Sequence, residues 1–355
     1  MDFSYRFPAV RGLQAEKEYY IAMIPLRLLS KLFGSDDEYV PPEYRAQRRL
    51  NTTRIPVIKD YILENRQSYV FSALAASVDG EYEFSAITPS GDLGVLEISM
   101  DARFMIVDGQ HRKASIIEAI AEDQSLGNES ISVVFYEDKG LEHSQQMFTD
   151  LNKHAVKTSN SIAELYDSRD PLAVSTRRVV SSIQFLNQFT DKEKDILGKY
   201  SSNFFTLNTF YKANKKIIKK TECTEEVEHF LIQYWSTVTH YITPWNELVN
   251  KELCKVDLRE KYIVTQAIFI QALGVLGNYY FNHPNVELDG SLKNLEAIDW
   301  SRSAPCWKDR VIRPDGKIIN STGAARLACN VLKGVLGIPL DKEDLGYEKK
   351  FNGEK

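Results

Sequence analysis

The hydrophobic pattern of this 355-residue chain changes near residue 160. Before that point, segments with strand-like alternation are interleaved with segments of helical periodicity. After it, the apolar residues follow helical spacing almost throughout. Because helices interleaved with several strands form mixed sheet-and-helix domains, we predict an α+β domain over residues 1–160 and a mainly α-helical domain over residues 161–355. The length suits one large domain or two ordinary ones.

In the first half, turn signals divide the chain into short elements. Asp79-Gly80 closes one strand-like run, and Gly34 ends an apolar segment. The predicted elements are a strand or helix that leads into a helix over 16–33, helices over 55–67, 110–123 and 142–155, and strands over 68–80, 81–87, 94–100, 103–107 and 131–138.

Long stretches with apolar periodicity dominate the second half. The predicted elements are helices over 225–249 and 260–281, a hairpin over 311–319 and a helix over 321–337. We expect the hairpin to turn around residues 314–316. The last helix is expected to be capped by Ser321 or Thr322 and stopped by Gly337.

The composition is 43% apolar and 26% charged, which is typical of a soluble globular protein. No apolar run reaches the roughly 18 residues that span a bilayer, and the first residues lack the pattern of a signal peptide. We therefore expect a cytoplasmic protein with no membrane partner. Four widely spaced cysteines without a C-x-x-C pair argue against an iron–sulfur cluster or a disulfide framework. The net charge of -5 argues against a positively coated protein and leaves room for a local basic patch.

An apolar run ends abruptly in Asp108-Gly109-Gln110-His111-Arg112, after which helical spacing begins. A strand that turns through glycine into a helix presents unpaired N–H groups to anions. His111 and Arg112 add donors, and arginine grips phosphate through two parallel hydrogen bonds. Asp108 suits a magnesium ion or a water aligned for attack. The five residues predict a phosphate- or nucleotide-binding site; the alternative is an ordinary Asp-Gly turn closed by a salt bridge to Asp108.

An arginine-rich segment is a candidate for contact with DNA or nucleotide. It contains Arg45, Arg48, Arg49 and Arg54, opposed only by Glu43. If the segment is helical, the first three arginines share a face, and clustered guanidinium groups suit phosphate backbones. The alternative is a solvated face, or ion pairs with the acidic residues just upstream.

A lysine stripe in the second half is the most positive stretch of the chain. Lys212, Lys215, Lys216 and Lys219 follow helical i, i+3, i+4, i+7 spacing. This spacing favours non-specific DNA contact by Lys215, Lys216 and Lys219. A solvated helix face is the alternative.

Asn152 and Lys157 close the helix predicted over 142–155 and are further nucleotide-binding candidates. Lys157 is expected to reach back to the turn at 108–112, and Asn152 to orient a base or a water. The alternative is capping of the helix C-terminus by cations, which the helix dipole favours.

Several long blocks of the sequence resemble the DndB family of DGQHR-domain proteins. The resemblance is dense over most of the first 170 residues and thinner beyond them. The blocks that carry it are VDGQHRKASI, FPAVRGLQAEKEYYIAMIPLRLLSKLF, PPEYRAQRRLNTTRIPVIKDYILENRQSYVFSALAASVDG, SQQMFTDLNKHAVKTSNSIAELYDSRDPLA, YSSNFFTLNTFYKA and WKDRVIRPDGKIINSTGAARL.

The resemblance implies a fold that periodicity alone does not. DGQHR domains are similar to the ParB/sulfiredoxin superfamily, in which the corresponding strand-to-helix turn binds nucleotide phosphates. Sulfiredoxins carry a catalytic cysteine at this turn, where the present chain has Gln110. Because an amide cannot act as a thiol nucleophile, sulfiredoxin chemistry is excluded at this position.

The resemblance also implies a function. Proteins of this family are encoded with the bacterial DNA phosphorothioation machinery and act as DNA-binding negative regulators of its genes. The implied partners are double-stranded DNA at the promoter of those genes and other phosphorothioation proteins, with a homo-oligomer left open. Two alternatives remain. One is an ATP or GTP hydrolase in which Asp108 or Asn152 aligns Mg²⁺ or water; the other is a docking scaffold for the modification enzymes.

Overall fold

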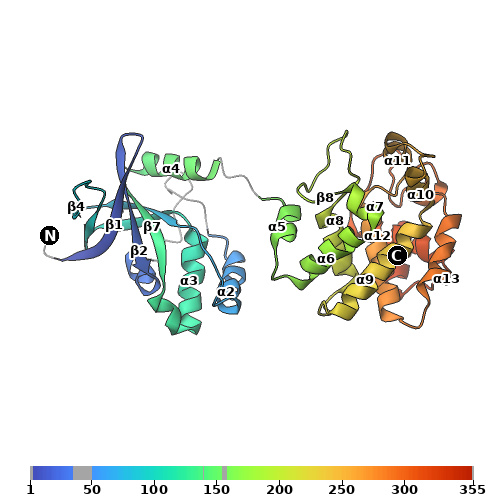
Figure 1. Ribbon diagram of the computed structural model, residues 1–355, viewed down its shortest axis with the longest axis horizontal. Coiled ribbons are helices and arrows are strands. Elements are labelled where there is room, and N and C mark those ends of the chain that lie inside the picture. Colours follow the sequence, from blue (N-terminus) through green and yellow to red (C-terminus); the bar gives the residue numbers. More distant parts are fainter. Residues whose placement is uncertain (1–2, 35–49, 139, 154–157, 354–355) are drawn as a thin grey trace. The chain divides into compact units, whose positions relative to one another are not determined.

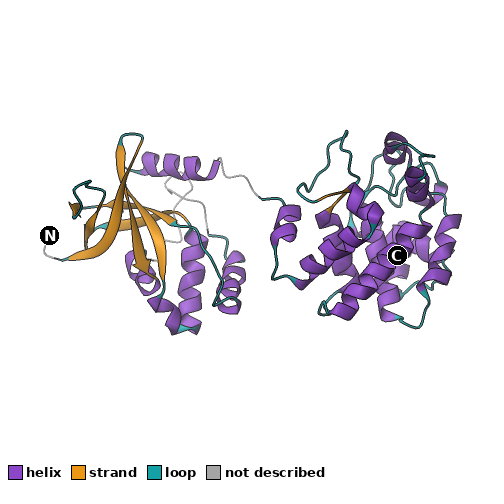
Figure 2. Cartoon of the chain, viewed as in Figure 1, coloured by secondary structure: helices purple, strands orange, loops and turns teal. Residues whose placement is uncertain are grey.

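The computed structural model describes residues 3–34, 50–138, 140–153 and 158–353. The chain divides into two compact units, Met1–Val156 and Lys157–Lys355. The first unit combines a sheet with helices, and the second is almost entirely helical (Figures 1 and 2). The protein is therefore a mixed α/β protein.

The first unit is built on a seven-stranded sheet with the strand order β4-β5-β1-β2-β7-β3-β6. Neighbouring strands are antiparallel except β3 and β7, which run parallel. The order leaves β6 at one edge of the sheet. The strands are β1 (Ser4–Gln14), β2 (Lys17–Pro25), β3 (Leu74–Asp79), β4 (Tyr82–Ala86), β5 (Leu93–Ser99), β6 (Arg103–Asp108) and β7 (Ser130–Glu137).

One face of this sheet forms a core with two helices that pack against each other, α2 and α3. Alternate strand residues point to the same face, so Ile24 and Val133 are fully buried there together with Ile62 and Ile116 from the helices. The helical elements of the unit are η1 (Leu26–Leu28), α1 (Leu29–Leu32), α2 (Arg54–Glu64), α3 (Gln110–Glu122), η3 (Gln124–Asn128) and α4 (Leu141–Lys153).

The elements predicted for the first unit between residues 16 and 155 are confirmed, with ends that shift by a few residues. The largest shift is at 68–80, where the strand begins only at Leu74. Strand β1 is present although no element is predicted over its residues.

The second unit is a helical assembly with one short pair of parallel strands, β8 (Thr190–Asp191) and β9 (Phe205–Thr206). Its four tryptophans, at positions 235, 245, 300 and 307, are each no more than 2% exposed and form part of the core. The helical elements are α5 (Asn160–Tyr166), α6 (Pro171–Ser182), α7 (Gln184–Phe189), α8 (Leu207–Ile218), α9 (Glu225–Tyr241), α10 (Thr243–Val249), α11 (Lys255–Lys261), α12 (Ala267–Asn282), α13 (Leu288–Leu292), η4 (Lys293–Ala297), η5 (Pro305–Trp307), α14 (Thr322–Val335) and α15 (Lys342–Phe351).

Two predicted helices of this unit are corrected by the structure. The stretch 225–249 is two helices, because the chain breaks at Ile242 and Pro244 occupies the first turn of α10. The helix predicted over 260–281 begins only at Ala267, since Tyr262 pairs with Ser301 in an isolated β-bridge.

The helix predicted over 321–337 is confirmed as α14. The Ser321 side chain caps it by accepting a hydrogen bond from the Ala324 N–H, and Gly337 follows its end with a φ of 69°. An isolated bridge between Ile312 and Ile318 supports the predicted hairpin. Within the described chain, we find no helix whose length and apolar character would carry it through a bilayer.

Candidate functional site

The candidate site is the corner where edge strand β6 ends at Asp108 and helix α3 begins at Gln110. Gly109 joins them with a φ of +97°. A Cβ atom at this position would lie 2.4 Å from Cδ2 of Leu74. Both the left-handed backbone and the close packing therefore require glycine. The predicted turn of a strand through glycine into a helix is confirmed.

Arg112 is held by partners within the first unit. Its Nη1 donates to the carbonyl oxygens of Ser72 and Ala73 at 2.7 and 2.8 Å, and to the Ser72 hydroxyl at 2.5 Å. Its Nη2 forms an ion pair with Asp108 at 2.7 Å. The side chain of Arg112 is 18% exposed and that of Asp108 is 40% exposed. The guanidinium group thus ties the start of α3 to the segment that leads into β3.

The next polar side chains of α3 also hold backbone atoms of distant segments. His111 is buried, and its Nε2 accepts a hydrogen bond from the N–H of Asn51 at 2.9 Å. The buried Lys113 ammonium donates to the Gly34 carbonyl at 3.3 Å. The Ser115 hydroxyl donates to the Ile55 carbonyl at 3.1 Å. Lys113 and Ser115 were not among the predicted site residues, although both lie in the segment that carries the family resemblance.

The electrostatics of the corner follow from these contacts. The positive end of the α3 dipole and the Arg112 guanidinium both face Asp108, so the carboxylate balances them locally. Gly109 at the N-cap of α3 has no side chain that could accept a hydrogen bond from the first-turn N–H groups, which point toward the start of the helix. The positive end of a helix dipole favours an anion, whereas the Arg112 side chain is already engaged with Ser72, Ala73 and Asp108.

The other predicted nucleotide-binding residues lie partly outside the described chain. Asn152 belongs to α4, a helix that packs against β6, and Lys157 lies outside the described residues. Arg45, Arg48 and Arg49 also lie outside them.

Arg54, the last of the predicted arginines, is exposed at the first position of α2. Arg54 directly precedes Ile55, whose carbonyl oxygen accepts the hydrogen bond from the Ser115 hydroxyl. This position lies next to the segments that α3 holds.

The predicted lysine stripe lies on α8. Leu207, Phe210, Ala213 and Ile217 are buried on one side of this helix. Lys215 is exposed and Lys216 half-buried on the other side. Lys219 is exposed just beyond the helix end, with a φ of 52°. The helix is amphipathic, and the lysines occupy its solvent face.

The described residues contain no group of three or more His, Cys, Asp or Glu side chains placed to hold a metal ion. The fold and site define a two-unit protein with a DGQHR strand–turn–helix in its α/β unit and a lysine-faced helix in its helical unit.

The family model for DndB, described as DNA-sulfur modification-associated, matches residues 7–339. The chain therefore belongs to the DndB family and to the proteins associated with DNA sulfur modification. No curated protein and no solved structure matches the chain.

Proposed function

We propose that this protein is a DNA-binding regulator in a DNA sulfur modification system, acting as a transcriptional repressor of the modification genes. The observation that carries the proposal is the lysine face of α8. Within the described chain, Lys215, Lys216 and Lys219 form no ion pair with an acidic side chain. Their charges remain available for a polyanion.

The packing of α8 fixes these lysines on the exposed side of the helix. Its opposite side lies in the helical core, packed against α6 and α12. The lysine side must consequently face outward. Each lysine that neutralises a DNA phosphate releases counterions, so the affinity gained in this way falls steeply with salt. The arginines at 45, 48, 49 and 54 are proposed as a second DNA contact on the first unit.

A second candidate function is nucleotide binding at the turn of residues 108–112, with hydrolysis as its extension. It is favoured by the strand–glycine–helix turn with Gly109 at the N-cap of α3, since the N-terminus of a helix attracts anions. In this proposal the backbone N–H groups and Lys157 receive phosphates, and Asp108 or Asn152 aligns Mg²⁺ or water. His111 and Arg112 support the site by holding its backbone. A ParB/sulfiredoxin-like fold for the first unit belongs to the same proposal, supported by the parallel β3–β7 pair and the strand–glycine–helix turn.

Gel retardation with duplex DNA from upstream of the modification genes tests the regulator. The key variant is Lys215→Gln/Lys216→Gln. The matched control is Lys349→Gln/Lys350→Gln, which also removes two lysines from the last turn of a helix, both of them exposed. The slope of log affinity against log salt should fall by about 2 in the first variant and stay unchanged in the second.

The regulator, the docking scaffold and the hydrolase predict different experimental results. An Arg48→Ala/Arg49→Ala variant tests the first unit in the same assay. Absence of retardation at any low salt would overturn the regulator, and co-purification of the modification enzymes under those conditions would assign a docking scaffold. Phosphate release that requires both nucleotide and Mg²⁺, and that is lost in a folded Lys157→Gln variant, would assign a hydrolase.

A further inference from the structure

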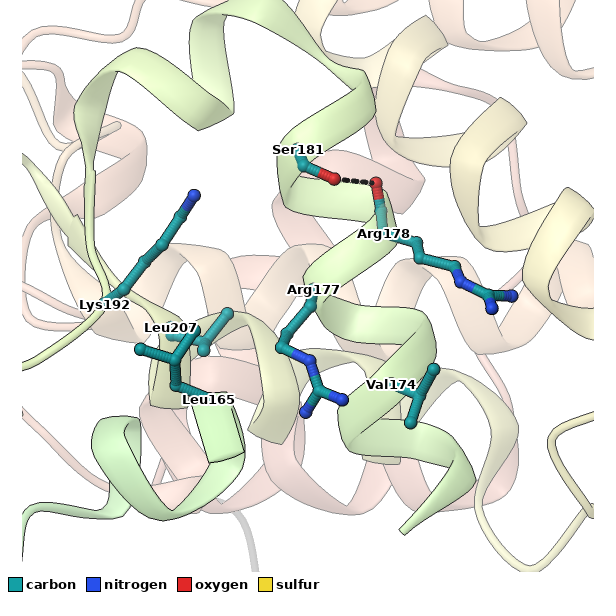
Figure 3. A pocket seen from close by; sticks show the side chains of 7 residues that line it. All are labelled: Leu165, Val174, Arg177, Arg178, Ser181, Lys192 and Leu207. Atoms are coloured by element: carbon teal, nitrogen blue, oxygen red, sulfur yellow. Dashed lines mark hydrogen bonds between the residues drawn. The ribbon is translucent and has the colours of Figure 1, made fainter. Parts of the chain in front are cut away.

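The second unit contains a pocket with a volume of about 290 Å³ between α5, α6, Lys192 and the start of α8 (Figure 3). Its lining divides into three aliphatic side chains, three cations and one hydroxyl. No acidic residue of the described chain lines it. The lining residues are Leu165, Val174, Leu207, Arg177, Arg178, Lys192 and Ser181.

Two of the three cations have no acidic partner within the described chain. Arg177 projects from α6 between Leu165 and Val174 (Figure 3). It donates only to backbone carbonyls, those of Glu164 and Asp167. Lys192 donates to the side-chain oxygen of Asn187 at 3.0 Å. Since carbonyl and amide oxygens are neutral, the charges of Arg177 and Lys192 remain uncompensated.

The third cation behaves differently. Arg178 points away from Lys192 (Figure 3) and pairs with Glu228 at 3.0 Å. The positive potential of the pocket therefore comes mainly from Arg177 and Lys192.

The backbone around Lys192 is fixed before any ligand arrives. The Asp191 carboxylate accepts hydrogen bonds from the N–H groups of Glu193 and Lys194, both at 2.9 Å. Further along, the Asp195 carboxylate accepts from the N–H groups of Asn160 and Ser161 at 2.8 and 2.9 Å. These bonds hold the chain on both sides of Lys192, which lowers the entropy cost of binding.

We propose that this pocket binds a single nucleotide unit, with its phosphate on Arg177 and Lys192 and its sugar or base on Leu165, Val174 and Leu207. The cation pair suits a phosphate through charge-assisted hydrogen bonds, and the aliphatic floor suits an apolar or planar group. The volume lies at the lower end of small-molecule pockets, at roughly 300 Å³, which matches one nucleotide unit rather than several. The unit comes from a DNA strand, in which case the pocket deepens the proposed DNA binding, or from a free nucleotide.

The test compares two variants with a matched control. Lys192→Gln removes a pocket charge, and Val174→Phe fills the pocket without changing charge. Lys194→Gln removes an exposed lysine two residues along the same loop, outside the pocket lining. One probe is a fluorescein-labelled single-stranded oligonucleotide, read by anisotropy, and the other is a nucleoside 5′-monophosphate, read by titration calorimetry.

The expected result is a loss of affinity on the order of tenfold in Lys192→Gln and Val174→Phe for at least one probe, with Lys194→Gln unchanged. A loss for the oligonucleotide alone assigns a strand phosphodiester, and a loss for the monophosphate alone assigns a free nucleotide. Equal affinities in all variants, or no binding of either probe, would overturn the proposal. Duplex retardation together with no loss for either probe in Lys192→Gln leaves the regulator standing while the pocket fails; a loss of monophosphate binding in Lys192→Gln without any duplex retardation does the reverse.

Discussion

Glu164 makes the stability of the helical unit depend on pH in a direction opposite to that of most carboxyl groups. The side chain, on α5, is about nine-tenths buried, and its Oε2 has no hydrogen-bond partner in the described chain. Burial, followed by the negative charges of Asp195 and Asp170, raises its pKa from 4.5 to about 7, while Lys212 partly opposes the shift. The folded protein therefore holds this proton more tightly than the unfolded chain.

The sign and size of the effect follow by linkage. Between pH 4.5 and 7 the folded state binds more protons at Glu164 than the unfolded state, so the free energy of unfolding falls as pH rises through this window. Since a pKa difference of one unit corresponds to about 1.4 kcal/mol, the free energy of unfolding lost across this window is at most about 3 kcal/mol. A Glu164→Gln substitution removes the ionisable group. We expect its stability relative to wild type to improve by about 1–3 kcal/mol between pH 5 and pH 8, after allowing for relaxation of the ionised site.

Urea unfolding followed by tryptophan fluorescence is the natural assay, because all four tryptophans lie in the helical unit. The difference in unfolding free energy between Glu164→Gln and wild type is measured at pH 5 and pH 8. Glu222→Gln, a substitution at an exposed position of the same unit, is the control. A difference that does not change with pH, or that favours the variant more at pH 5, would refute the reasoning.

Two further predictions concern side chains that hold distant segments. Arg112→Lys should destabilise the first unit by about 2–3 kcal/mol, because one ammonium group cannot replace the fork that reaches Ser72 and Asp108 together; calorimetry should show the loss while the tryptophan transition stays in place, and an unchanged first unit would contradict it. Asp344→Ala should cost about 3–5 kcal/mol by leaving the buried Lys333 ammonium unpaired. Urea unfolding measures this cost, and the double substitution Asp344→Leu/Lys333→Met should recover most of it; a double variant as unstable as the single one would show that the pair is not the cause.

Strand β1 shows why an element of the fold was not predicted from the sequence. It carries Pro8, and proline in a strand lacks the N–H that a central position requires. In the structure β1 pairs with β5 over residues 4–10 and with β2 only from Ala9 onward. Pro8 therefore lies where one side of the strand is unpaired, and proline is tolerated there. The pairing range that resolves the conflict depends on strands distant in sequence.

The candidate site was predicted in its local part and not in its long-range part. The strand, Gly109 and the helix are predicted from neighbouring residues. The alternative of a salt bridge between Arg112 and Asp108 also comes from neighbouring residues, and this salt bridge is present at 2.7 Å. The contacts of Arg112 with Ser72 and of His111 with Asn51 join residues 40 and 60 positions apart. No local periodicity encodes such pairs.

These contacts bear on where the protein is able to hold a phosphate group. A phosphate that used the Arg112 side chain would have to displace Asp108 and two carbonyl oxygens, each lost hydrogen bond costing about 1 kcal/mol or more. Lys215 and Lys192 require no such exchange, since neither has an acidic partner in the described chain. For the proposed function, the balance of charges therefore favours the helical unit for phosphate contact through side chains, and leaves only backbone N–H groups for a phosphate at the turn after β6. Removing Lys215 or Lys192 should then weaken polyanion binding more than Arg112→Lys does in a variant that stays folded.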